Sequence, residues 1–337
     1  MATVELNAPR EYETLRVSVA QYKQFRSQGF VILKGLVPPA DVAEMNAFMD
    51  AMVSGDAMAD APLDLRGYGV LPTDRQDWVR AHMLHRISPV HERFLLHPRI
   101  LDALAAFIGP DVLALQSMAF WKKPGDPGQG YHQDSYYIPS YPDTLCGAWL
   151  ALTPATIENG CVWFAAGSQH DPVYPDARGM GAALSANIGD LGTIDNASVT
   201  DESVNGLTRI VKANYANAAI AGEVEPGDVI FFGGHIIHWS YTNRADYPRR
   251  AFVGHYCNAR SFVPWNHGDP YEGDSANYLH ILARGTTHLP YAQPRFGTPC
   301  AANQPREAAT AAPAGSMMGM DDGMMGEMPH AAEMDPD

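Results

Sequence analysis

Cysteine is scarce in this sequence, and its spacing excludes two common uses of the residue. The 337 residues contain four cysteines, Cys146, Cys161, Cys257 and Cys300, and no two of them form a CxxC pair. A zinc ribbon and a dithiol redox site both need such pairs, so neither is predicted. Four cysteines in a chain of this length also exclude the dense disulfide stapling of small secreted domains.

Long apolar runs and basic segments are lacking as well. No stretch approaches the roughly 18 consecutive apolar residues of a membrane-spanning helix, and the start, MATVELNAPREYETL, has no basic segment followed by an apolar one. We therefore expect no membrane partner and a cytoplasmic location. The formal net charge is -15, without any local basic patch. Such a chain repels phosphate backbones, so nucleic acid is not an expected partner.

Residues 301–337 lack the groups from which a core forms. They contain no aromatic residue, seven of the 15 methionines, and one basic residue, Arg306, against seven acidic ones. A segment of this kind cannot bury enough apolar surface to offset the entropy of ordering it. We predict a disordered, Met-rich acidic tail. The alternative is weak binding of a soft metal such as Cu(I) by its methionines and histidine.

Helical patterns dominate the first 110 residues. Capping residues, helix-opening prolines and glycine stops predict helices at 18–29, from 38 to at least 52, and at 98–109. The apolar run FVIL at 30–33 is typical of a buried strand.

From Val112 the pattern changes to short strands separated by Gly, Pro, Asn and Asp clusters. The predicted strands are 112–121, 146–152, 161–165, 229–232 and 251–257. Many short strands after a helical start favour an antiparallel barrel or jelly roll flanked by helices. We therefore expect one mainly β domain over 1–300, made of a helical part (1–110), a jelly-roll core (111–260) and a C-terminal extension (261–300).

The strongest local motif is Tyr131-His132-Gln133-Asp134, directly after the glycine- and proline-rich loop KPGDPGQG. In an extended chain, residues i and i+2 point to the same face, so His132 and Asp134 can present an imidazole and a carboxylate to one ion. A second histidine from a distant strand would complete a 2-His-1-carboxylate face, which leaves sites open for a cosubstrate and dioxygen. The alternative for HxD alone is a hydrogen-bonded structural pair.

Three later histidines are candidates for the second imidazole. The stretch GDVIFFGGHIIHWSYTNRADYPRRAFVGHY contains His235, His238 and His255. If a strand from Val229 continued with period two, His235 and His238 would face opposite sides, so only one would join the site. The pattern does not choose between them, and His255 suits the core or a position beside the ligands.

Four ordered segments resemble the phytanoyl-CoA dioxygenase family of Fe(II)- and 2-oxoglutarate-dependent oxygenases, over roughly residues 22–256. They are FRSQGFVILKGLVPPADV, GYHQDSYYI, ENGCVWFAAGSQH and the histidine-containing stretch quoted above. The resemblance implies a mainly β fold with flanking α-helices and a double-stranded β-helix (jelly-roll, cupin-like) core. It also implies Fe(II) bound by His132, Asp134 and His238, with 2-oxoglutarate and dioxygen as cosubstrates.

The resemblance assigns further residues to the cosubstrate. Arg249, eleven residues beyond His238, matches the arginine that holds the far carboxylate of 2-oxoglutarate. Ser240 matches a position that adds a hydroxyl to the same carboxylate, and Gln116 resembles another cosubstrate contact. A guanidinium suits this role because it forms a bidentate fork and stays charged. The adjacent Arg250 would point the other way in a strand.

Residues that flank these motifs allow two interpretations. Tyr136, Tyr137 and Trp239 either line a substrate pocket or fill the barrel core. Lys122 and Lys123 either belong to a solvated turn or contact an anion.

The sequence thus predicts a dioxygenase that hydroxylates a small or medium organic substrate and releases succinate and CO2. Asp134 favours hydroxylation, because related halogenases have a small residue in its place to admit halide. One alternative is a jelly-roll metalloprotein that uses another divalent metal for non-oxidative chemistry, and a second is a non-catalytic jelly-roll binding protein. The substrate and the oligomeric state are left open.

Overall fold

A computed structural model of the chain describes residues 10–56, 80–86, 88–174, 206–263 and 280–287. All of them belong to the unit Met1–Gln304. The predicted tail at 301–337 lies outside the described residues, and the division of 1–300 into three parts stays a prediction.

Helices precede most of the strands along the chain, as the sequence predicts. The α-helices are α1 (Val19–Gln28), α2 (Pro39–Ser54), α3 (Pro89–Leu95), α4 (Pro98–Ile108), α5 (Asp134–Tyr137) and α6 (Gly206–Ile210). Other helical turns are η2 (Leu84–Arg86), η3 (Ser168–His170), η4 (Val211–Tyr215) and η5 (Ala216–Ala218). The strands are β1 (Phe30–Leu33), β2 (Arg80–His82), β3 (Val112–Lys122), β4 (Cys146–Ala151), β5 (Val162–Ala165), β6 (Ala219–Gly222), β7 (Val229–Gly233), β8 (His238–Ser240), β9 (Arg249–Asn258) and β10 (Ile281–Arg284).

The ends of α1 show why the first helix could be predicted. Ser18 and Gln21 form a reciprocal capping box, in which each side chain accepts a hydrogen bond from the other residue's backbone N–H. Gly29 ends the helix in the left-handed conformation at φ +84°, with its N–H bonded to the Phe25 carbonyl. The predicted strand at 30–33 follows at once as β1.

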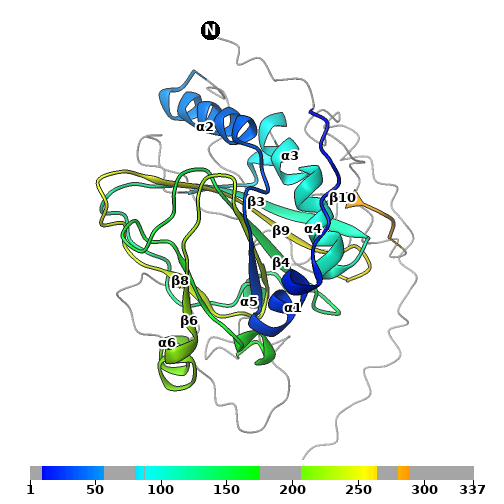
Figure 1. Cartoon of the computed structure of the whole chain (residues 1–337), viewed down its shortest axis with the longest axis vertical. Helices are drawn as coiled ribbons and strands as arrows, with labels where there is room; N and C mark the ends of the chain where they lie inside the picture. Colours follow the sequence, from blue (N-terminus) through cyan, green and yellow to red (C-terminus); the bar gives the residue numbers. More distant parts are fainter. Residues whose placement is uncertain (1–9, 57–79, 87, 175–205, 264–279, 288–337) are drawn as a thin grey trace, which may run out of the picture. The chain divides into compact units, whose positions relative to one another are not determined.

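Two antiparallel sheets form the core of the domain (Figure 1). The larger sheet has the order β1-β7-β4-β9-β3-β10, with β2 paired to the far part of β3, and the smaller has the order β6-β5-β8. From β6 to β9, consecutive strands of the chain alternate between the two sheets, as in a jelly roll. The predicted mainly β jelly-roll fold is confirmed.

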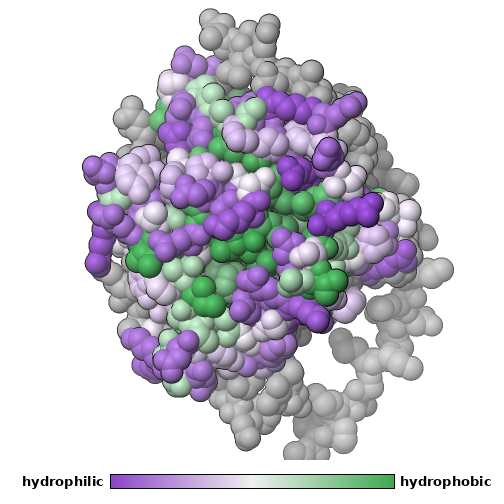
Figure 2. Space-filling model, viewed as in Figure 1, coloured by the Kyte–Doolittle hydropathy of each residue, from purple (hydrophilic) through white to green (hydrophobic). Residues whose placement is uncertain are grey.

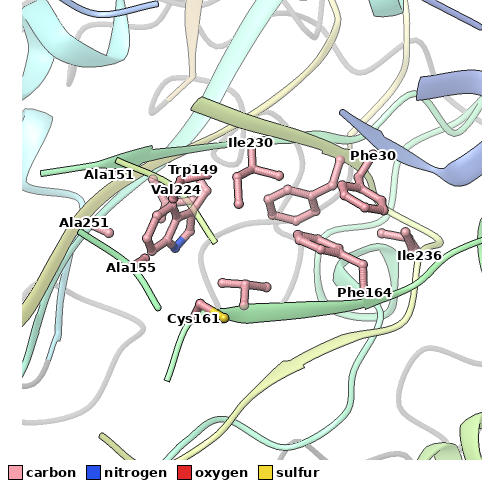
Figure 3. Close-up of a cluster of buried hydrophobic side chains, with 13 residues drawn as sticks. Phe30, Trp149, Ala151, Ala155, Cys161, Phe164, Val224, Ile230, Ile236 and Ala251 are labelled. Atoms are coloured by element: carbon pink, nitrogen blue, oxygen red, sulfur yellow. The ribbon is translucent and has the colours of Figure 1, made fainter. Parts of the chain in front are cut away.

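Apolar side chains from both sheets meet between them (Figure 3). Phe30 of β1 stacks on Phe164 of β5 with ring centroids 4.5 Å apart. Trp149 of β4 and Ile230 of β7 extend the same buried cluster. The sandwich interior is therefore filled at this level.

Helices cover the outer face of the larger sheet. Phe252 of β9 points away from the sandwich interior toward Phe94 of α3, at a centroid distance of 6.2 Å. Phe107 of α4 likewise meets Phe231 of β7 at 5.4 Å. Because one face of each strand is committed to these helices, the alternate residues face the interior and are available to build a site.

The surface in the same orientation is mixed in character. Figure 2 shows a central apolar area surrounded by hydrophilic side chains. Among the described residues, no helix combines the length and the apolar character needed to cross a bilayer.

Candidate metal centre

His132 and His238 are brought together by backbone pairing. The N–H of each donates to the carbonyl of the other, at 3.1 and 3.0 Å, which makes the two residues an isolated antiparallel bridge. Their rings lie 4.0 Å apart between centroids. Directly opposed residues in such a bridge place their side chains on the same side of the sheet.

Asp134 reaches the same point from a helix rather than from a strand. Gln133 has the extended backbone that the sequence predicts, at φ -117° and ψ 129°, but it also caps α5, whose first residue is Asp134. The turn still directs the carboxylate to the imidazoles: Asp134 Oδ1 lies 3.6 Å from Nε2 of both His132 and His238. One ligand atom from each of the three buried residues lies within 4.8 Å of the others.

The hydrogen bonds of the two rings fix their tautomers. His132 Nδ1 donates to the Gly130 carbonyl at 2.8 Å, and His238 Nδ1 donates to the Ile236 carbonyl at 3.1 Å. A ring that donates from Nδ1 in its neutral form presents an unprotonated Nε2 toward Asp134. The Gln129 amide accordingly lies 3.2 Å from His132 Nε2. Burial, together with the neighbouring His238, lowers the pKa of His132 to about 3, so this ring is neutral at pH 7.

Asp134 is held ionised by its neighbours. Burial alone would raise its pKa, but the His238 and His255 imidazoles more than compensate and lower the pKa. His255 Nε2 donates to Asp134 Oδ2 at 3.0 Å, which leaves Oδ1 turned toward the two candidate ligands. His255 thus occupies the position beside the ligands that the sequence allowed.

His235 lies elsewhere. The assumed continuous strand through His235 and His238 is wrong, because β7 ends at Gly233 and β8 begins at His238. His235 Nε2 contacts Asp143 Oδ2 at 2.6 Å, and its Nδ1 lies 2.9 Å from the Asp171 carbonyl. The structure therefore brings His238, and not His235, to Asp134.

The three candidate ligands line a cavity of about 450 Å³ between the sheets. Met118, Phe120, Trp149, Phe232, Trp239 and Val253 supply apolar walls, and Arg80, Lys122, Ser240 and Arg249 supply polar groups. Among the described residues that line it, Asp134 is the only acidic one. A volume of this size accommodates a small ligand or two.

Arg249, predicted to hold the cosubstrate, is 4% exposed and lines this cavity. Its Nη1 donates to the Gly160 carbonyl, its Cζ lies 5.3 Å from the centroid of the Trp149 ring, and its Nε is buried without a protein partner. Burial lowers the pKa of Arg249 to about 10, so the guanidinium stays charged at pH 7. Arg250 points away and pairs with Asp50 at 2.6 Å, which confirms the expected alternation.

Ser240 and Lys122 lie beside Arg249. Ser240 Oγ accepts a hydrogen bond from the Gln129 N–H at 3.0 Å and lies 3.5 Å from Lys122 Nζ. Lys122 is 3% exposed, so the solvated-turn interpretation is wrong for it. Gln116 is buried on β3 opposite His255 and is not among the residues that line the cavity.

The aromatic residues near the motifs divide between the two interpretations. Trp239 lines the cavity and stacks on Tyr131 with centroids 4.3 Å apart. Tyr136 is buried, and the Tyr137 ring lies 6.4 Å from the His132 ring.

Sequence reasoning missed Arg80 and Trp149. Arg80 follows no recognisable motif, and only its pairing with Phe120 across β2 and β3 brings it to the cavity. Trp149 lies on a predicted strand, where period two places it on the same face as Gly147 and Ala151. Whether that face points into the cavity depends on the order of the strands in the sheet, which the sequence does not give.

Comparison with known proteins identifies relatives of this arrangement. The chain matches the phytanoyl-CoA dioxygenase (PhyH) family over residues 25–251. Phytanoyl-CoA dioxygenase domain-containing protein 1 of Bos taurus is 23% identical over 289 residues, which cover 73% of this chain and 92% of that protein. Peroxisomal phytanoyl-CoA dioxygenase of Homo sapiens is 24% identical over 256 residues, which cover 72% of this chain and 69% of that protein.

Solved structures share the fold. EctD from S. alaskensis, with 2-oxoglutarate and 5-hydroxyectoine, is 18% identical at a TM-score of 0.57, covering 84% of this chain and 89% of EctD. The non-heme alpha-ketoglutarate-dependent carbocyclase SnoK from nogalamycin biosynthesis is 20% identical at a TM-score of 0.53, covering 73% of this chain and 85% of SnoK. Because the family match spans well over half of its residues, the chain belongs to the phytanoyl-CoA dioxygenase family of Fe(II)- and 2-oxoglutarate-dependent oxygenases.

Proposed function

We propose that this protein is an Fe(II)- and 2-oxoglutarate-dependent dioxygenase that hydroxylates a small or medium organic substrate. The observation that carries the proposal is the convergence of the Nε2 atoms of two buried histidines on one carboxylate oxygen at 3.6 Å. A cation placed between these three atoms would be attracted to all of them. Family membership and the fold shared with EctD, which has been solved with bound Fe, support the choice of metal.

The donor set fits the proposed metal. Two neutral imidazoles and one carboxylate are the facial ligands of non-heme Fe(II) oxygenases, and they leave positions for other ligands. His132 and His238 would supply Nε2, and Asp134 would supply Oδ1, while His255 holds Oδ2. The backbone carbonyls on both Nδ1 atoms would keep the rings oriented while the metal binds and leaves.

The polar end of the cavity fits a dicarboxylate. Arg249 is a buried cation, and its Nε–H has no hydrogen-bond partner in the protein. Burying a charge costs free energy, and a bound anion would offset that cost. We assign the distal carboxylate of 2-oxoglutarate to Arg249 and Ser240. Gln116 keeps its predicted role as a cosubstrate contact only if its side chain turns toward the cavity.

The protein's own contribution is positioning and exclusion of water. When bound, the iron would activate dioxygen at the expense of 2-oxoglutarate, which leaves as succinate and CO2. Apolar walls at Phe120, Phe232 and Val253 would keep the reacting carbon in a dry space. A cavity of about 450 Å³ that also holds the cosubstrate leaves room for a substrate of modest size.

An anaerobic titration tests the proposal. Fe(II) and 2-oxoglutarate are added separately and together to the metal-free protein, and the visible spectrum is recorded before and after oxygen is admitted. We expect a weak charge-transfer band only with both present, and its loss as succinate forms. Metal binding without the band would favour the non-oxidative metalloprotein, and no metal binding would favour the binding protein.

The reaction outcome needs a second measurement, because the structural neighbours include an epimerase and a carbocyclase. Once a substrate is found, the mass of the product distinguishes hydroxylation from epimerisation and ring closure. Hydroxylation adds one oxygen atom, and 18O2 labels it. A product without added oxygen would contradict hydroxylation while leaving the dependence on iron and 2-oxoglutarate intact.

A further inference from the structure

We propose that Arg80, at the mouth of the cavity, binds a carboxylate of the organic substrate, which makes that substrate a small apolar acid. This role rests on the proposed function, because it concerns the substrate of the same site. Membership of the family leaves the substrate open, whereas a charged side chain on the cavity wall narrows the choice.

The sheet register directs Arg80 to the cavity. Arg80 is the first residue of β2 and is directly paired with Phe120 of β3, and two residues later His82 is paired with Met118. Side chains of directly opposed residues lie on the same face of a sheet, and Phe120 and Met118 both line the cavity. Arg80 itself lines the cavity and is nevertheless exposed. Its guanidinium therefore stands where the cavity opens to solvent.

Arg80 and Arg249 approach the cavity from opposite sides of β3. Strand β9, which carries Arg249, pairs with one edge of β3, and β2 pairs with the other. Arg249 is enclosed at 4% exposure, so the two guanidiniums suit two different anions, one held inside and one that enters from solvent. Arg80 also acts on the candidate metal centre, because its charge adds to burial and to the His238 ring in lowering the pKa of His132.

No acidic side chain of the described residues pairs with Arg80. Its side chain forms neither an ion pair nor a hydrogen bond with them. The other two arginines discussed here differ: Arg250 pairs with Asp50, and Arg249 donates to the Gly160 carbonyl. The N–H donors of Arg80 are therefore available to a ligand in the mouth of the cavity.

The charge of Arg80 also has no counterpart once the proposed metal and cosubstrate are bound. The charges of Fe(II) and Arg249 then balance those of Asp134 and the 2-oxoglutarate dianion. Lys122 already contacts two backbone carbonyls and the Ser240 hydroxyl. A substrate carboxylate would neutralise Arg80, and it would accept two parallel hydrogen bonds from the planar guanidinium.

Apolar side chains next to Arg80 define the rest of the substrate. Met118, Phe120 and Val253 line the same cavity, and Val253 is paired with Met118 across β3 and β9. A carboxylate fixed at Arg80 would lay its hydrocarbon part along these walls. Two hydrogen bonds to one planar group also fix the direction of the chain, which would bring one of its C–H bonds to the metal centre.

Two other roles of Arg80 give different results in binding experiments. A guanidinium that is only solvated at the rim would not distinguish a carboxylate from a neutral ligand. A guanidinium that holds the cosubstrate would weaken 2-oxoglutarate binding when it is removed. Binding of 2-oxoglutarate and binding of a second, separate carboxylate must therefore be measured independently.

The experiment uses protein loaded with Ni(II), which holds the site without turnover. Calorimetry first measures 2-oxoglutarate binding. Protein saturated with 2-oxoglutarate is then titrated with unbranched carboxylates from butanoate to octanoate and with the corresponding primary amides, which keep the shape without the charge. The variant is Arg80→Gln. Arg244→Gln is the matched control, because it removes the same charge from an exposed arginine that is not among the residues lining the cavity.

We expect wild type to bind at least one carboxylate about tenfold more tightly than its amide, the effect of a charge-assisted hydrogen bond. Arg80→Gln should reduce this preference to within about threefold, and should bind the amide and 2-oxoglutarate like wild type. Arg244→Gln should keep the preference.

Three results would overturn the role of Arg80: no preference for any carboxylate in wild type, a preference that survives in Arg80→Gln, or weaker 2-oxoglutarate binding by that variant. If the wild-type Ni(II) protein bound no 2-oxoglutarate at all, the proposed function itself would fail, which is a separate result.

Discussion

The ring nitrogens of His132, His238 and His235 have different hydrogen-bond partners. His132 and His238 each donate one hydrogen bond, from Nδ1 to a carbonyl, and keep Nε2 as an electron-pair donor. His235 has acceptors at both nitrogens, the Asp171 carbonyl and the Asp143 carboxylate. Both of its nitrogens must donate, which requires the imidazolium form. The first two rings are therefore suited to bind a metal, and the third is suited to an ion pair.

Replacing each histidine separately tests this distinction. His238→Ala removes a proposed ligand and should lower Fe(II) affinity by more than the roughly 10- to 100-fold that losing an outer-shell partner costs. His235→Ala should leave Fe(II) affinity within a few-fold of wild type. Anaerobic Fe(II) titrations of both variants measure the affinities. Equal loss in the two variants would contradict the ligand assignment.

The His235–Asp143 pair should make stability depend on pH. Burial opposes the charge of His235, but the hydrogen bond with Asp143 prevails and raises its pKa above 6.5. Its contribution is therefore fully present below pH 6.5 and is lost as the pH rises through the folded-state pKa. Asp143 has a lowered pKa despite its burial, so its contribution is present above pH 3.8 and is lost as the pH falls.

His235→Gln should consequently destabilise the protein more at pH 6 than at pH 9. Urea unfolding of wild type and variant at both pH values gives the two free-energy differences. A difference that stays constant or grows with pH would show that His235 is neutral in the folded protein.

Arg249→Ala separates cosubstrate binding from metal binding. The variant removes a buried cation at the polar end of the cavity and leaves the three candidate ligands unchanged. We expect 2-oxoglutarate affinity for the Ni(II) protein to fall roughly 100-fold, as for truncating one partner of a buried charge pair. Ni(II) affinity, measured in parallel, should stay near the wild-type value. Retained 2-oxoglutarate affinity would remove Arg249 from the proposed site.

At the scale of secondary structure, elements with strong end signals were predictable and very short ones were not. The capping residues bound α1 correctly, and the strands β3, β4, β7 and β9 begin or end within two residues of their predicted limits. The three-residue β8 carries His238 and Ser240, yet three residues are too few to show a period. The same limit hid α5, whose four residues begin with Asp134.

The candidate site was only partly predictable for a related reason. His132, Asp134 and Arg249 belong to motifs that a sequence displays directly. Lys122 reaches the cavity because it is paired with Arg249 across two strands that lie more than a hundred residues apart along the chain. Long-range register of this kind follows from the fold as a whole and not from any local pattern.

An ion cluster holds the segment before α1 against the helical layer and gives an element-scale prediction. Asp41 of α2 is 3% exposed, accepts a hydrogen bond from the Tyr12 hydroxyl at 2.8 Å, and pairs with Arg10. Asp41→Asn should lower the free energy of unfolding by about 1–3 kcal/mol, because it weakens the hydrogen bond and the ion pair of a buried carboxylate. Asp50→Asn on the same helix is the control: its carboxylate is exposed, and its pair with Arg250 should contribute less than about 1 kcal/mol. Chemical denaturation measures the free energy of unfolding of both variants. An equal decrease in the two would contradict the role of burial.

At the scale of the whole molecule, net charge and site charge have opposite signs. The chain carries -15 overall, yet the described residues that line the cavity include Arg80, Lys122 and Arg249 and only one carboxylate, that of Asp134. Local cations decide what binds, because charges farther than about 8 Å away are largely screened at physiological ionic strength. The acidic composition therefore excludes polyanions from the surface and still permits a small dianion inside.

The predicted tail contributes to the net charge and, by composition, not to the core. Truncation after Gln304 removes seven acidic residues and one basic residue. The thermal midpoint should stay within about 2 °C, because a 1 kcal/mol effect in a domain of this size shifts it by roughly that much.

Truncation should also leave the affinity for 2-oxoglutarate unchanged at 0.15 M salt. At low salt the association rate of 2-oxoglutarate should rise, because less negative charge opposes the approaching dianion. Stopped-flow binding of 2-oxoglutarate to the Ni(II) protein at two salt concentrations measures the association rate. A lower thermal midpoint after truncation would show that the tail stabilises the domain.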